Sequence, residues 1–175
     1  MALRVCARFE PRRFEVEDER GLVHGRLLDS GEADVYAVVH DMTWLCGVRR
    51  TRWGWSGVVF EQHSDQLVAR YAPRLLGGGT IVIGDQPYTL RKTTTGRGWR
   101  LQDVQKGLVW TMRPLKVKSR SKHSDDDDPV VTEIAPGPCG RRQENLLFTI
   151  LLGVWITDLE EEARHRSRPG PGPNV

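Results

Sequence analysis

One segment near the end of the chain limits the possible folds more than any other. Residues 146–156 are apolar except for Thr149 and Gly153. The apolar residues between Leu146 and Leu159 fall on every side of a helical wheel, so a helix here must be surrounded by protein or lipid. Because the segment is well short of the roughly 20 residues that cross a bilayer, we expect a helix buried in protein. It should span 143–164, ending in the charged residues around Glu160 and Arg166.

The chain before this helix consists of short segments in which apolar and polar residues alternate. Turn residues such as Gly21 and the Gly84–Asp85 pair separate them. Many short strands at regular spacing are typical of a sandwich or a barrel. We expect about twelve strands, in segments around Phe14 and Val16, at 22–28, 35–39, 43–49, 58–62, 66–71, 80–83 and 87–92, around Trp99 and Leu101, and at 108–112, 116–119 and 130–134.

A sheet closed around the apolar helix would satisfy both parts of the chain, and closure would also remove exposed sheet edges. The sequence therefore predicts a mainly β protein, a closed antiparallel barrel of about twelve strands around one buried C-terminal helix. In the core of that helix we expect Leu147, Leu151 and Trp155 to be almost fully buried. Residues 1–166 should form this domain. The Pro- and Gly-rich residues 167–175 should be a disordered tail.

The stretch Thr80–Pro114 resembles the Tubby C-terminal-like superfamily, with LURP-one-related and phospholipid-scramblase-like proteins as closer relatives. The shared signature joins an aromatic strand, a Trp-x-Leu-x-Asp strand, a glycine turn and a further strand. The positions that fit are Tyr88, Leu90, Trp99, Leu101, Asp103 and Gly107. The resemblance extends over about Phe9 to His165 and implies a twelve-stranded barrel threaded by a hydrophobic helix, with phosphoinositide binding among the Tubby relatives. The Trp-rich segment 49–57 and the Asp-rich loop at 125–128 depart from the family pattern.

A search for catalytic and metal-binding motifs identifies no catalytic residue, metal site or cofactor. Cys46 lies in an apolar strand and is expected in the core, and Cys139 has no obvious base nearby. No CxxC, HxH or HExxH motif occurs. The run Asp125–Asp128 lacks the spacing and glycine of a calcium loop, so a solvated loop at 119–128 is expected.

One cluster combines charges and aromatic rings: Arg49, Arg50, Arg52, Trp53 and Trp55. Indoles favour the headgroup region of a bilayer, and guanidinium groups pair with phosphates. The same mixture could bind nucleic acid by stacking, or the tryptophans could cap one end of the barrel in a connecting loop. These three interpretations stay open at the level of sequence.

The function expected from these observations is non-catalytic binding of an anionic ligand, such as a lipid headgroup or membrane surface. The alternatives are an enzyme or small-molecule carrier that uses a cavity in the barrel, and a scramblase-like membrane protein. Nucleic acid is a less favoured partner, because the formal net charge is only +3. Three cysteines are too few for a disulfide framework, which favours a reducing, cytoplasmic location, peripheral to a membrane if lipid is bound. The sequence does not indicate an oligomeric state.

Overall fold

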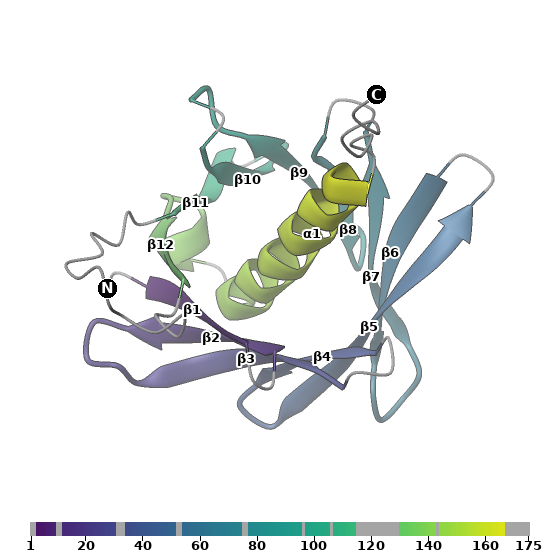
Figure 1. The fold of residues 1–175 in the computed structure, drawn as a ribbon, viewed down its shortest axis with the longest axis horizontal. Coiled ribbons are helices and arrows are strands. Elements are labelled where there is room, and N and C mark those ends of the chain that lie inside the picture. Colours follow the sequence, from purple (N-terminus) through teal and green to yellow (C-terminus); the bar gives the residue numbers. More distant parts are fainter. Residues whose placement is uncertain are drawn as a thin grey trace, which may run out of the picture.

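The computed structural model describes residues 3–9, 12–30, 34–51, 54–74, 77–95, 97–105, 107–114, 130–142 and 144–166. Twelve antiparallel strands follow one another around a closed barrel, and the first strand pairs with the last. A single α-helix lies inside the ring of strands (Figure 1). The expected fold class is therefore confirmed.

The elements are β1 (Leu3–Phe9), β2 (Arg12–Asp18), β3 (Val23–Asp29), β4 (Val35–Val39), β5 (Met42–Thr51), β6 (Gly54–Glu61), β7 (Leu67–Pro73), β8 (Gly79–Ile83), β9 (Gln86–Lys92), β10 (Trp99–Asp103), β11 (Gly107–Pro114), β12 (Val130–Pro136), the 3-10 helix η1 (Gly140–Arg142) and α1 (Leu146–Arg166).

The closing strand β1 was not among the predicted strands. It pairs with β2 on one side and with β12 on the other, and Leu3 lies opposite Ile134. Leu3 and Val5 face the core and are almost fully buried, whereas Arg4 between them is exposed. The predicted strand at 116–119 lies outside the described residues, as do the loop 119–128 and the tail 167–175.

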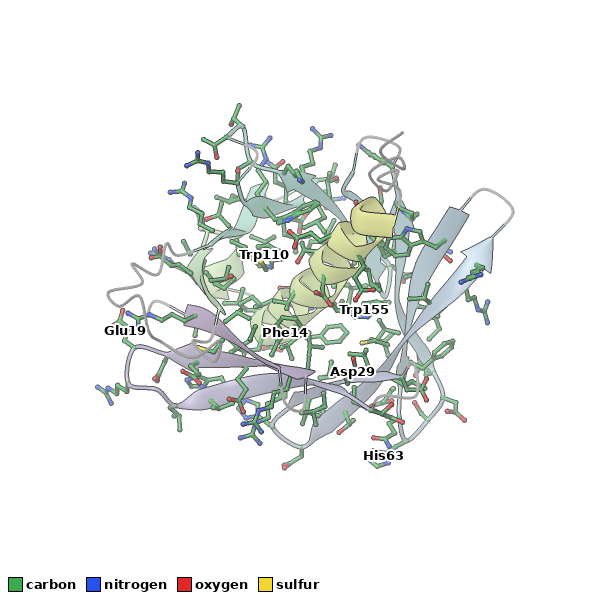
Figure 2. All side chains as sticks on the ribbon, in the orientation of Figure 1. Phe14, Glu19, Asp29, His63, Trp110 and Trp155 are labelled. Atoms are coloured by element: carbon green, nitrogen blue, oxygen red, sulfur yellow. The ribbon has the colours of Figure 1, made fainter. Side chains whose placement is uncertain are left out.

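The helix α1 occupies the interior and supplies much of the core. Ile150, Leu151 and Ile156 are fully buried, and Trp155 is nearly so. In Figure 2, Trp110 of β11 lies inside the barrel, whereas Glu19 and His63 lie on its outside. The helix begins at Leu146 rather than at residue 143, because the 3-10 turn of η1 comes first.

The prediction that Leu147 is almost fully buried is wrong. Leu147 is only half-buried, packed against the edge of the core. The reason is its position in the first turn of α1, at the end of the barrel where the helix begins. We call this end the lower end, and the opposite end, where α1 finishes, the upper end. Strands with odd numbers run from the lower to the upper end.

Three glycines let the helix fit closely inside the barrel. A Cβ atom at Gly25 of β3 would lie 3.2 Å from Leu151, and one at Gly57 of β6 would lie 3.0 Å from the ring of Trp155. Within α1, a Cβ atom at Gly153 would lie 2.3 Å from the ring of Trp110. Because these three positions carry no side chain, β3 and β6 pack closely against α1, and α1 packs closely against Trp110. These contacts fix the position of α1 along the barrel axis.

Candidate functional site

The predicted Arg and Trp cluster lies on a hairpin that extends past the barrel wall. Strand β4 pairs with β5 only as far as Cys46, and β7 pairs with β6 only from Gly57 onward. Among the described residues, 49–51 of β5 and 54–56 of β6 therefore pair with each other alone. We call these two segments the ribbon. The predicted strands end at residue 49 and begin again at 58, with a connecting loop as one interpretation of the segment between them. In the structure, β5 continues to Thr51 and β6 begins at Gly54, so both predicted bounds are corrected.

The ribbon presents two arginines to solvent, one on each of its faces. Arg49 lies opposite Ser56, and Arg50 lies opposite Trp55. Both arginines are exposed, and within the described part of the chain neither has an ion-pair partner. Arg52 and Trp53, the other predicted residues of the cluster, lie outside the described residues.

Trp55 has a different environment from the two arginines. It is half-buried, and its ring centroid lies 5.3 Å from that of Tyr71, with the two rings tilted by 46°. The hydroxyl group of Tyr71 in turn donates a 2.8 Å hydrogen bond to the buried Glu160 of α1. Trp55 therefore anchors the base of the ribbon to the core, which is the packing role that sequence analysis considered for the tryptophans.

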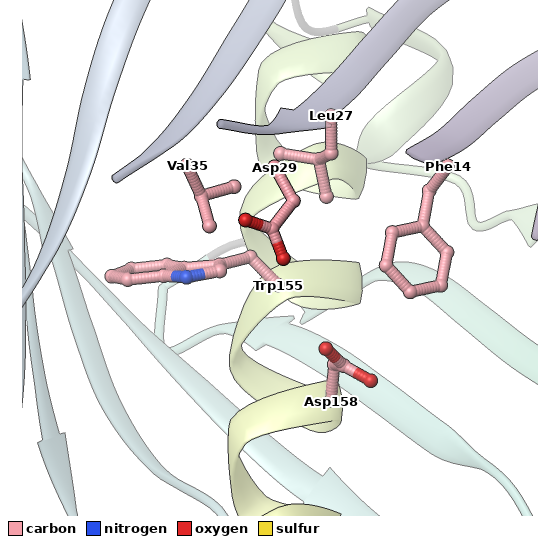
Figure 3. Close-up of a pocket in the computed structure, with 6 residues that line it drawn as sticks. All are labelled: Phe14, Leu27, Asp29, Val35, Trp155 and Asp158. Carbon is pink, nitrogen blue, oxygen red and sulfur yellow. The ribbon is translucent and has the colours of Figure 1, made fainter. Parts of the chain in front are cut away.

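A second feature of the upper end is a small crevice between α1 and strands β2 to β4 (Figure 3). Two carboxylates, two aromatic rings and two aliphatic side chains line it, namely Asp29, Asp158, Phe14, Trp155, Leu27 and Val35. Its volume is about 20 Å³, which accommodates a single water molecule. The lining residues come from distant parts of the sequence, and no pattern in the chain indicates that Asp29 and Asp158 meet.

Two other polar groups, Cys46 and Asp18, serve the fold. Burial raises the pKa of the Cys46 thiol to about 12, so this cysteine stays protonated and is a poor nucleophile. The carboxylate of Asp18 accepts hydrogen bonds from the backbone N–H groups of Leu22 and Arg20, and it lies 3.2 Å from His24. The Leu22 hydrogen bond is the main cause that lowers the pKa of Asp18. These bonds hold the β2–β3 turn together.

The described residues contain neither a metal-binding cluster nor a membrane-spanning helix. Among those residues, no group of three or more His, Cys, Asp or Glu side chains is arranged to hold a metal ion. No described helix has the length and apolar character needed to cross a bilayer.

Comparison with known proteins assigns no family to this chain. No family model, no curated protein sequence and no solved structure matches it.

Proposed function

We propose that this protein is a non-catalytic barrel that binds an anionic ligand, such as a lipid headgroup, at its surface. The observation that carries the proposal is that Arg49 and Arg50, on opposite faces of the ribbon, are both exposed without a carboxylate partner among the described residues. Arginine binds phosphate through parallel N–H donors, and it is less strongly hydrated than lysine. Each of the two arginines can therefore bind a phosphate group of its own at a membrane surface.

Two further points support binding at the surface rather than inside the barrel. The core around α1 is filled by side chains such as Leu151 and Trp110, both fully buried. The crevice beside Trp155 accommodates one water molecule, which is too little for the small-molecule carrier considered above. The resemblance to Tubby-like proteins, with their phosphoinositide ligands, supports a lipid headgroup as the ligand. The proposal therefore includes a peripheral position at the cytoplasmic face of a membrane.

Co-sedimentation with vesicles tests the proposal. The parent protein should bind vesicles that contain acidic lipids and should bind neutral vesicles poorly. Each arginine near an anionic surface contributes on the order of 1 kcal/mol. The triple variant Arg49→Gln, Arg50→Gln, Arg52→Gln should therefore bind about a hundredfold more weakly. Added salt should weaken binding of the parent, because exposed charges are screened over about 8–10 Å.

The matched control is the double variant Arg20→Gln, Arg141→Gln. Both residues are exposed, and both lie at the lower end of the barrel, so their loss should leave vesicle binding nearly unchanged. Circular dichroism should show the parent spectrum for all variants, because Arg49 and Arg50 make no packing contact in the core. A parent protein that ignores acidic vesicles, or a triple variant that binds like the parent, would contradict the proposal.

A further inference from the structure

Charge in this barrel follows strand direction. Strands β5 and β9 run to the upper end with arginine or lysine among their last residues, and Arg74 directly follows the upper end of β7. The turns at the lower end contain carboxylates instead. This alternation separates positive and negative charge between the two ends of one molecule.

The basic residues at the upper end form an arc over neighbouring strands, which we call the basic rim. It consists of Arg49, Arg50, Arg74, Arg91, Lys92 and Arg97. All six are exposed except Lys92, whose Nζ atom lies 5.4 Å from the ring centroid of Trp99. In the described upper ends of β5 to β10 (49–51, 54–56, 72–74, 77–80, 90–95 and 97–100) there is no acidic residue.

The lower end has the opposite character. Its exposed turn residues include Glu19, Asp41, Asp65 and Asp85, from four successive hairpin turns. The helix α1 begins at this end, so the positive pole of its dipole lies among these carboxylates. Arg20 and Arg141 are exposed basic residues there.

The basic rim does not continue around the whole upper end. Strand β3 finishes in Asp29, which faces Asp158 across the crevice. On α1, Glu161 is exposed near the same end. At β11, Arg113 lies opposite Glu133 of β12. The positive surface is therefore confined to the half of the upper end formed by β5 to β10.

We infer that the basic rim as a whole binds an extended, planar anionic surface, namely a bilayer containing acidic lipids, with the barrel standing on its upper end. This inference rests on the proposed function and specifies its partner. Strands β5 and β9 are four strand spacings apart, about 20 Å at about 4.8 Å per strand. That distance exceeds one lipid headgroup and the screening length of about 8 Å at physiological ionic strength. Charges along the rim thus contact separate phosphates, while the acidic lower end is repelled from the membrane.

The first test compares two double variants on vesicles containing acidic lipids. Arg74→Gln, Arg97→Gln removes charge from the rim away from the ribbon, and Arg49→Gln, Arg50→Gln removes charge from the ribbon itself. At about fivefold per arginine, each double variant should bind roughly 25-fold more weakly than the parent. The lower-end variant Arg20→Gln, Arg141→Gln should bind like the parent.

The outcomes separate this inference from the proposed function. If the parent fails to bind acidic vesicles, the proposed function is wrong and the inference falls with it. If the ribbon variant loses binding but Arg74→Gln, Arg97→Gln does not, the protein binds one headgroup at the ribbon and the inference alone is overturned. Equally tight binding of the parent to a single-stranded oligonucleotide at the same phosphate concentration would favour nucleic acid over membrane.

A second test measures orientation directly. A polarity-sensitive dye is attached to Thr94→Cys in the upper β9–β10 turn or to His63→Cys in the lower β6–β7 turn, in a Cys139→Ser background. Both positions are exposed, whereas Cys6 and Cys46 are buried. Acidic vesicles should shift the emission to shorter wavelength for the dye at position 94 and leave the dye at position 63 unchanged. A shift at position 63 would overturn the end-on orientation.

Discussion

Gly153 is the residue where the helix and the barrel wall come closest. A Cβ atom there would lie 2.3 Å from Cζ2 and 2.4 Å from Cη2 of Trp110, which is fully buried. Gly153→Ala must therefore displace either the indole or the helix. Overpacking of this kind costs about 1–3 kcal/mol, which lowers the melting temperature by several degrees in a chain of this size. Urea unfolding followed by circular dichroism measures the effect.

Gly47→Ala is the matched control for this prediction. A Cβ atom at Gly47 would meet Val58 at 3.7 Å, an ordinary contact, so this variant should be close to the parent in stability. The double variant Gly153→Ala, Trp110→Phe should lose less stability than the sum of the two single changes, because the smaller ring makes room for the methyl group. Additive losses would show that the two residues do not compete for the same space.

Cys46 makes the stability of the fold depend on pH in the alkaline range. Burial raises the pKa of its thiol from 9.0 to about 12. Above pH 9 the unfolded chain loses this proton while the folded chain keeps it, so the free energy of unfolding falls as the pH rises. The slope attributable to Cys46 approaches about 1.4 kcal/mol per pH unit between these two pKa values. Urea midpoints measured from pH 8 to 11 should therefore fall more steeply for the parent than for Cys46→Ala, and parallel curves would contradict this account.

At the scale of elements, the strands with clear alternation were predictable and β1 was not. Arg4 and Arg8 lie between apolar residues at the start of the chain, so no continuous apolar run marks a strand there. In the barrel, the strand alternates in the ordinary way, because buried Leu3 and Val5 face inward and Arg4 faces out. A strand whose outer face is basic resembles a loop when only apolar continuity is considered.

The ribbon was missed for a related reason. Its residues have no neighbouring strand on either outer side among the described residues, so no apolar alternation marks it as part of a sheet. The sequence identified the Arg and Trp cluster as a candidate site. It did not show that the tryptophan packs on the core while the arginines face solvent. Only the fold shows that Trp55 packs on Tyr71 while Arg49 and Arg50 remain exposed.

The helix α1 depends on the barrel for its surroundings, and Leu151 tests this. Leu151 is fully buried and faces Gly25 of β3. Leu151→Asp would bury a carboxylate in this apolar contact and should abolish soluble expression. The control Leu147→Asp places the same carboxylate at a half-buried position near the lower end, where water reaches it, and should cost much less. Equal expression of Leu151→Asp and the parent would contradict a buried helix.

At the scale of the whole molecule, the sequence separates the barrel from its C-terminal tail. Residues 167–175 contain no large apolar side chain except the final Val175, so nothing there is suited to a core. Their deletion should leave the melting temperature within about 1 °C of the parent, as is usual for changes away from packed residues. Differential scanning fluorimetry of the parent and the shortened chain measures this. A loss of several degrees would show that the tail contributes to the folded structure.

The pairing of β1 with β12 also determines when the protein can fold during synthesis. Leu3 of β1 leaves the ribosome well before its partner Ile134, which lies in β12, the last strand of the barrel. Until β12 has been made, one edge of β1 has no partner strand. Until α1 has been made, the inward apolar faces of the strands are not covered. Closing such a distant contact is slow, because most of the chain must be ordered first. Nascent chains of this protein thus expose unpaired apolar strands until β12 and α1 have been made.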